Sequence, residues 1–236
     1  GIIYKKADLF DKAEKIFKKG LRKDKKYIRF YGNLANVLQN KGNYQEALQY
    51  YNKAIQLEPN YHEAIFSRAL LYLLMGNFRD GWKGYESRWQ INAITKQDFS
   101  VPEWNGQNIK NKNLLLWAEQ GFGDSIQFIR YAPLIQEKVD QLIVKCQASL
   151  KELFHSVTGI DEIITEDDTK TTYDYHLPML SLPRIFNTSE ESIPATTPYL
   201  KPDKSARRKV EKFLETEQEI YNIAIVWSGN SKHKND

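Results

Sequence analysis

The residues that most readily suggest chemistry form a glycine-containing loop, Glu119-Gln120-Gly121-Phe122-Gly123-Asp124. An apolar run from Leu114 to Ala118 precedes the loop, and apolar residues at helical spacing follow it. This order is typical of a buried strand, a tight turn and the start of a helix. Such a junction directs backbone N–H groups and the positive end of a helix into a crevice. The loop is therefore the first candidate for a ligand site.

Asp124 has two interpretations. An acid at the N-cap of a helix is favoured for structural reasons alone. Alternatively, Asp124 acts as a general base at the carboxyl end of a strand, where open α/β sheets bind ligands. In that case Gln120, Gln127 and Arg130 border the same crevice, although Arg130 lies far along the expected helix.

Other catalytic classes fit the sequence poorly. A dinucleotide-binding G-x-G-x-x-G motif needs a third glycine where Ile126 stands, and neither a Walker A motif nor G-x-S-x-G occurs. The four histidines, at positions 62, 155, 176 and 233, lack metal-ligand spacing. Cys146, the single cysteine, lies in an apolar run and is expected to be a buried, inert thiol. We expect neither a metal nor a resident cofactor.

The composition is that of a globular protein. The chain has 236 residues, of which 41% are hydrophobic and 27% charged, enough material for about two domains. No run approaches about 18 apolar residues, so no membrane span is expected. One cysteine and no signal peptide favour the cytoplasm. Lysines crowd residues 5–26, which predicts a solvated helix face or a contact with an acidic surface, whereas the net charge of +4 argues against nucleic acid.

The N-terminal third repeats itself with a period of 34 residues. The recurring positions include Phe10, Tyr44 and Phe78, and also Ala13, Ala47 and Gly81. The stretch from Ile28 to Tyr61 closely resembles the tetratricopeptide repeat family, whose unit is a helical hairpin of this period. One hairpin cannot bury its own apolar face, so the hairpins must stack.

The resemblance implies a binding groove along the repeats. Inner helices of that family line a groove that binds peptides, which implies a groove role for Asn33, Asn36 and Asn40, spaced three and four residues apart. A merely solvated stripe is the alternative. Gly1 falls at the eighth position of a repeat, so the chain looks truncated at its N-terminus.

Three large aromatic residues, Trp82, Tyr85 and Trp89, follow the last repeat on one helical face. We expect them to dock onto the next domain, because the end of a repeat array is otherwise polar. A platform that stacks on sugar rings is the competing interpretation.

Beyond residue 112, short apolar runs alternate with helical patterns, which predicts a parallel α/β sheet. The expected strands are 114–118, 141–146, 162–165, 173–177 and 221–227. The expected helices are 124–138, 149–157 with Ser149 as N-cap, 180–186 and 205–218. The fold class is therefore helical hairpins followed by a Rossmann-like α/β domain. We divide the chain into repeats at 1–91, a surface linker at 92–112, the Rossmann-like domain at 113–202 and the start of a further domain at 203–236.

The order of motifs resembles bacterial repeat proteins fused to a GT-B type glycosyltransferase, related to heptosyltransferases and O-linked N-acetylglucosamine transferase-like enzymes. The motifs are the repeats, GWKGYESRW, PEWNG, LLLWAEQGFGDSIQFIRYAPLI, DYHLPMLSLPRIF, PYL and IAIVWSGNSKHKND. The resemblance implies that Asp124, in the Gly123-Asp124 pair, is the base for an acceptor hydroxyl. It also implies that the donor diphosphate binds the later loop, at Ser228, Gly229, Asn230 and Lys232.

The function implied by this resemblance is transfer of a sugar from a nucleotide diphosphate donor, which is a substrate and not a cofactor. The repeats would then recruit a peptide or protein, either the acceptor or a partner. Most of the donor-binding domain is missing from the sequence, so we expect this chain alone to be inactive. The alternative is a non-catalytic tetratricopeptide scaffold for protein–protein interaction.

Overall fold

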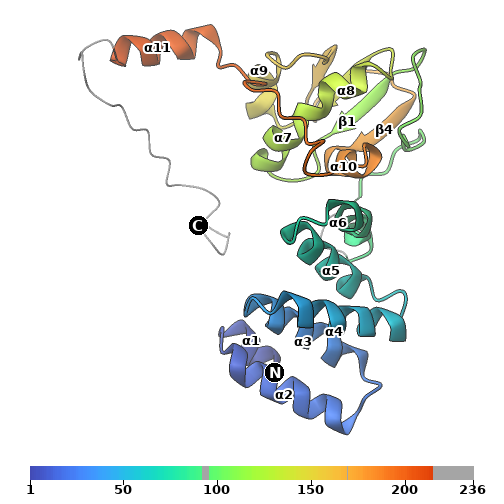
Figure 1. Ribbon diagram of the computed structural model, residues 1–236. Helices are drawn as coiled ribbons and strands as arrows, with labels where there is room; N and C mark the ends of the chain where they lie inside the picture. The colour runs from blue at the N-terminus through green and yellow to red at the C-terminus, as the bar shows by residue number, and fades with distance from the viewer. Residues whose placement is uncertain (92–95, 169, 215–236) are drawn as a thin grey trace.

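The computed structural model describes residues 1–91, 96–168 and 170–214, and shows a helical array joined to an α/β domain (Figure 1). The array consists of α1 (Ile2–Lys6), α2 (Phe10–Lys23), α3 (Ile28–Asn40), α4 (Tyr44–Leu57), α5 (His62–Leu74) and α6 (Phe78–Tyr85). A 3-10 turn, η1 (Glu86–Gln90), continues α6 toward the second domain. The predicted strand at 221–227 and the predicted phosphate loop at 228–232 lie outside the described residues.

Small residues and glycine turns explain the helical hairpins. Ala35 and Ala47 are fully buried between α3 and α4, where their size lets the helices approach closely. Gly42 and Gly76 end the first helices of successive hairpins with φ of +79°, a conformation that costs glycine little. At Gly84, a Cβ atom would lie 2.8 Å from the Cβ of Ala69, so glycine allows α6 to pack tightly on α5. The helical hairpins expected from the period of 34 residues are confirmed.

Within the described residues, the α/β domain contains a four-stranded parallel sheet with strand order β3-β2-β1-β4. Its strands are β1 (Leu114–Trp117), β2 (Leu142–Lys145), β3 (Glu162–Ile164) and β4 (Tyr175–Pro178). Its helices are α7 (Phe122–Phe128), α8 (Ala132–Gln136), α9 (Lys151–Phe154) and α10 (Leu182–Ile185), and α11 (Lys204–Leu214) follows. The parallel sheet predicted from the alternating pattern is confirmed.

Two helix predictions were wrong in detail. The helix expected at 124–138 is divided into α7, the 3-10 turn η2 (Ile129–Tyr131) and α8. Pro133 lies in the first turn of α8, where it lacks the N–H group that would otherwise donate to the Ile129 carbonyl and continue the helix. The helix expected from Ser149 begins at Lys151, after the 3-10 turn η3 (Ala148–Leu150), and no side chain caps it.

The two faces of the sheet are covered differently. Leu114 and Leu116 join the main core together with the helices of the domain. Leu115 and Ile143 point to the opposite face, where the loop aromatics Phe99 and Tyr173 cover them. The segment expected to be a surface linker is partly internal, because Trp104 is fully buried. The carboxyl ends of β1 and β4 then lead to the loops described next.

Candidate functional site

The end of the repeat array packs directly on the α/β domain through aromatic side chains. Trp82 meets Phe128 of α7 edge to face, with ring centres 5.6 Å apart. The rings of Tyr85 and of Phe66 in α5 have their centres 5.4 Å apart, and both rings pack with the core of the α/β domain. The expectation that these aromatics dock onto the next domain agrees with this packing.

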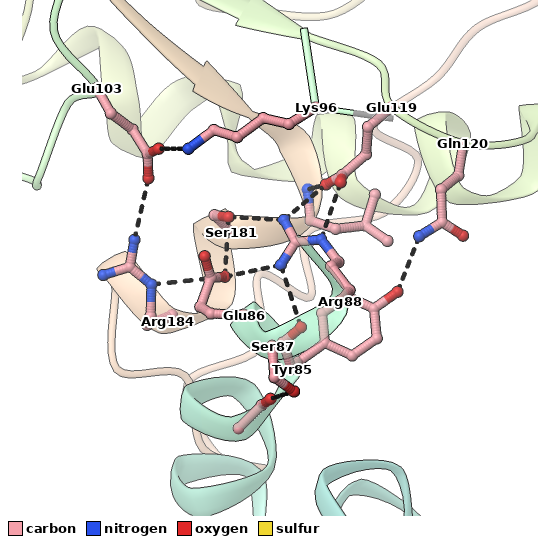
Figure 2. Close-up of polar contacts among 12 residues, drawn as sticks. Tyr85, Glu86, Ser87, Arg88, Lys96, Glu103, Glu119, Gln120, Ser181 and Arg184 are labelled. Carbon is pink, nitrogen blue, oxygen red and sulfur yellow. Dashed lines mark hydrogen bonds and ion pairs between the residues drawn. The ribbon is translucent and has the colours of Figure 1, made fainter. Parts of the chain in front are cut away.

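A buried arginine from the array enters the α/β domain beside these rings. Arg88 has a fully buried side chain and forms a bidentate ion pair with Glu119. Its Nε donates to Oε2 of Glu119 at 2.9 Å and its Nη2 donates to Oε1 at 3.0 Å (Figure 2). The guanidinium also lies over the ring of Trp89, 4.2 Å from the ring centre. This geometry combines charge, directional hydrogen bonds and stacking.

Further polar groups complete the network around Arg88 (Figure 2). The Ser181 hydroxyl accepts from Nη2 of Arg88 at 2.9 Å and donates to Oε1 of Glu86 at 2.9 Å. Glu86 also accepts from Nη1 of Arg88 at 2.9 Å. The Leu180 N–H donates to Glu119 at 3.1 Å, so each buried charge has several partners.

This network occupies the carboxyl edge of the sheet. Glu119 follows β1 and Ser181 follows β4, and these neighbouring strands are the place where the strand order reverses. Open α/β sheets usually bind ligands in the crevice at such a switch point. Here the side chain of Arg88 fills the space between the two loops.

Burial sets the ionisation of this region. It raises the pKa of Glu119 above the usual range, while the bonds from Arg88 and from the Leu180 N–H oppose that rise. Burial lowers the pKa of the Arg88 guanidinium, but the bonds with Glu119 outweigh it and the pKa is raised overall. Burial also raises the pKa of the Tyr85 phenol.

Arg88 is a residue of this edge that was not predicted from the sequence. A signal was present, because an arginine between Tyr85 and Trp89 in an apolar helical face requires an anion nearby. Glu119, at the start of the glycine loop, is an acid that could pair with Arg88. Only the tertiary structure shows that these two residues lie close together.

The structure places part of the predicted loop together. Gln120 donates to the Tyr85 hydroxyl at 2.9 Å, and its carbonyl accepts from Gln147 at 2.7 Å. Asp124 is partly exposed and its charge acts on Tyr85, so it lies on the same side of the loop. It is the third residue of α7, whose N-cap is Gly121, so Asp124 is not the N-cap, but it lies in the first turn, where an acid is favoured for structural reasons alone.

The remaining predicted loop residues differ in their surroundings. Gly121, Gly123 and Gln127 are exposed. Arg130 turns toward another segment, with Nη2 donating to the Tyr199 hydroxyl at 3.1 Å and Nε donating to the Gln127 carbonyl at 2.8 Å. Arg130 therefore serves a different surface from Asp124.

The three predicted groove asparagines lie on α3. Asn36 accepts from the hydroxyl of buried Tyr51 at 2.7 Å. Nδ2 of Asn33 donates to the Arg29 carbonyl at 2.8 Å, and Nδ2 of Asn40 donates to the Asn36 carbonyl at 2.7 Å. Asn33 and Asn36 are half-buried and Asn40 is exposed.

Comparison with known proteins gives matches to part of the chain. Protein FlbA of Caulobacter vibrioides is 36% identical over 74 residues, or 30% of this chain and 12% of FlbA. The uncharacterized protein MJ0572 of Methanocaldococcus jannaschii is 36% identical over 55 residues, or 23% of this chain and 64% of that protein. The chain thus spans less than two thirds of either relative.

Solved structures also match part of the chain. The TPR2B domain in a pHsp70 complex of yeast Sti1 has a TM-score of 0.37 at 21% identity, covering 39% of this chain and 77% of that one. PcrH in complex with the chaperone-binding region of PopD has a TM-score of 0.35 at 28% identity, covering 37% and 65%.

Within the described ranges, no helix is both long and apolar enough to cross a membrane. The tetratricopeptide repeat family model matches residues 28–61, which are the hairpin of α3 and α4. The match identifies this hairpin as a tetratricopeptide repeat, and further hairpins of the same 34-residue period stack on either side of it.

Proposed function

We propose that the chain is a protein-binding module that holds an extended peptide segment against α3 and α5. The observation that carries this proposal is the stripe of Asn33, Asn36 and Asn40 along α3. A side-chain amide carries both a donor and an acceptor, so it can pair with the backbone of an extended peptide whatever its side chains.

The next repeat continues the stripe with a different chemistry. One period of 34 residues after the asparagines stand Ser67, Leu70 and Leu74 on α5. The side chains of Leu70 and Leu74 are 39% and 61% exposed. The favoured occupant therefore has a backbone that pairs with the α3 amides and apolar side chains that cover the α5 leucines.

Tyr51 makes part of this surface rigid before any partner binds. Its buried hydroxyl holds Asn36 Oδ1 at 2.7 Å, which fixes the amide plane of Asn36. A preordered amide loses less conformational entropy on binding than a free one.

Selection of peptides from a random phage library on the immobilised chain, followed by anisotropy measurements, tests this proposal. The double change Asn33→Ala and Asn40→Ala should weaken a selected peptide by at least about tenfold, or about 1.4 kcal/mol. The control is Gln45→Ala with Gln49→Ala, two exposed residues of α4. Equal affinity in both double variants would overturn the proposal.

As a second candidate, we propose that the α/β domain is the acceptor-side half of a GT-B type glycosyltransferase. The supporting observation is a parallel sheet of order β3-β2-β1-β4 with Asp124, partly exposed, in the first turn of the helix after β1. Because Arg88 fills the space between the β1 and β4 loops, an acceptor would approach from the exposed Gly121 and Gly123. Asp124 would be the base for the acceptor hydroxyl, and the sugar would come from a nucleotide-sugar donor.

Transfer from a panel of nucleotide sugars by the full-length gene product tests the second candidate. Asp124→Asn should lower the rate by about 10²–10⁴, the usual contribution of a general base. Asp140→Asn, at an exposed position in the same domain, is the matched control. Undiminished transfer by Asp124→Asn would remove Asp124 from the mechanism.

A further inference from the structure

A cavity separate from the Arg88 network lies between α8, the turn after α9 and residues 192–201. Its volume is about 450 Å³, which falls within the range of small-molecule pockets. Arg130, Ser156, Thr196, Tyr199 and Lys201 contribute polar groups to its lining. Neither proposed function uses this cavity.

Arg130 is held in a fixed orientation at this cavity. Its guanidinium lies over the Tyr199 ring, 4.7 Å from the ring centre. Nε donates to the Gln127 carbonyl, Nη1 donates to the Pro194 carbonyl at 3.4 Å and Nη2 donates to the Tyr199 hydroxyl. That hydroxyl in turn donates to the Ile126 carbonyl at 3.1 Å. These bonds use three of the five guanidinium N–H groups, so two remain for a ligand.

The charge of the cavity is unbalanced. Among the described residues, no carboxylate forms an ion pair with Arg130 or Lys201, and no Asp or Glu lines the cavity. The main chain of Lys201 is anchored, because its N–H donates to the Ser156 hydroxyl at 2.9 Å. Two cations with neighbouring hydroxyls and no internal anion favour an anionic ligand.

The remaining walls indicate that the anion carries a carbon skeleton. Pro133, Leu134, Val157 and Pro198 contribute apolar surface to the same cavity. Inorganic phosphate would leave this surface and most of the volume unused. We infer that the cavity binds a soluble phosphate monoester of a small polar molecule, such as a sugar phosphate. The dianionic phosphate meets Arg130 and Lys201, and the organic part packs on the proline and leucine wall.

Titration of the ¹⁵N-labelled chain with glucose 6-phosphate, followed by NMR, tests this site. We expect saturable shifts of the Arg130 Nε–H signal and of the Ser156 and Lys201 amides. Lys201→Ala should weaken binding at least about fivefold, because it removes one of two cations without breaking a side-chain bond in the structure. Lys110→Ala is the control, since Lys110 is an exposed lysine that does not line the cavity.

Titrations with two further ligands decide what the site recognises. Glucose should produce no shifts, and inorganic phosphate should bind at least tenfold more weakly than the ester. If glucose bound as tightly as glucose 6-phosphate, the role of the cations would be overturned. If inorganic phosphate bound as tightly as glucose 6-phosphate, the role of the apolar wall would be overturned. The absence of saturable shifts, or an unchanged affinity of Lys201→Ala, would overturn the site itself. Arg130→Lys, checked for folding by circular dichroism, should also weaken binding because it loses the planar fork.

Discussion

The buried Arg88–Glu119 pair gives a quantitative prediction about how the array is joined to the α/β domain. Arg88→Met removes the cation but keeps an unbranched apolar side chain of similar length. Glu119 is then left as a buried carboxylate whose side chain is 0% exposed. Breaking a buried pair in this way costs about 3–5 kcal/mol, because the remaining charge is desolvated without compensation. Urea unfolding followed by tryptophan fluorescence measures this loss.

The loss of stability caused by Arg88→Met should increase as the pH rises. Burial already raises the pKa of Glu119, and loss of Arg88 removes a group that opposes this rise. An acid with a folded pKa above its unfolded value binds more protons in the folded state. Stability therefore falls as the pH rises from about 4.3, the unfolded value, through the raised folded pKa. The deficit of Arg88→Met should be larger at pH 7.5 than at pH 5.

A second substitution distinguishes the cost of the unpaired Glu119 charge from the cost of the packing lost at position 88. Glu119→Gln in the Arg88→Met background removes the charge but keeps an acceptor for the Leu180 N–H. The double variant should recover at least half of the lost stability. Arg79→Met, at an exposed position of α6, is the control and should change stability by less than about 0.5 kcal/mol. A deficit below about 1 kcal/mol, no recovery in the double variant, or no pH dependence would each refute the reasoning.

Three further predictions concern other buried polar groups. The double change Asn36→Ala and Gln39→Ala should cost about 1 kcal/mol in urea unfolding, because the buried Tyr51 hydroxyl loses its two amide acceptors, at 2.7 Å and 2.9 Å; an unchanged midpoint would contradict this. Burial lowers the pKa of His176, whose Nδ1 accepts from Trp117 at 3.3 Å, so stability is full above about pH 6.5 and falls as the pH drops below it. His176→Phe should flatten that slope, and an equally steep slope would exclude His176 as its source. Burial raises the pKa of Cys146 to about 11, so a thiol reagent at pH 8 should react with the unfolded chain much faster than with the native chain; similar rates would show an accessible thiol.

Local pattern was sufficient for most of the secondary structure. The period of 34 residues located α3 and α4, and β-branched and leucine-rich runs located the four described strands within one or two residues. These elements depend on neighbours in the sequence: helical spacing for the hairpins and short apolar runs for the strands. The helix expected at 124–138 is interrupted at residues 129–131, because Pro133 lacks the N–H group that would bond back to this turn, whatever the apolar spacing around it.

The sequence by itself determined that the chain has stacked helical hairpins, a parallel sheet and a glycine loop that leads from a strand into a helix. Only the tertiary structure decided what surrounds that loop. Arg88 lies 31 residues from Glu119 and 93 residues from Ser181, so no local pattern relates them. The packing of α6 on α7 brings these groups together. As a result, the guanidinium of Arg88 fills the crevice at the strand ends, and Asp124 lies on the exposed side of the glycine loop. Arg130 and Asp124 serve different surfaces for the same reason. The Arg130 guanidinium donates to the hydroxyl of Tyr199, a residue that is distant in the sequence.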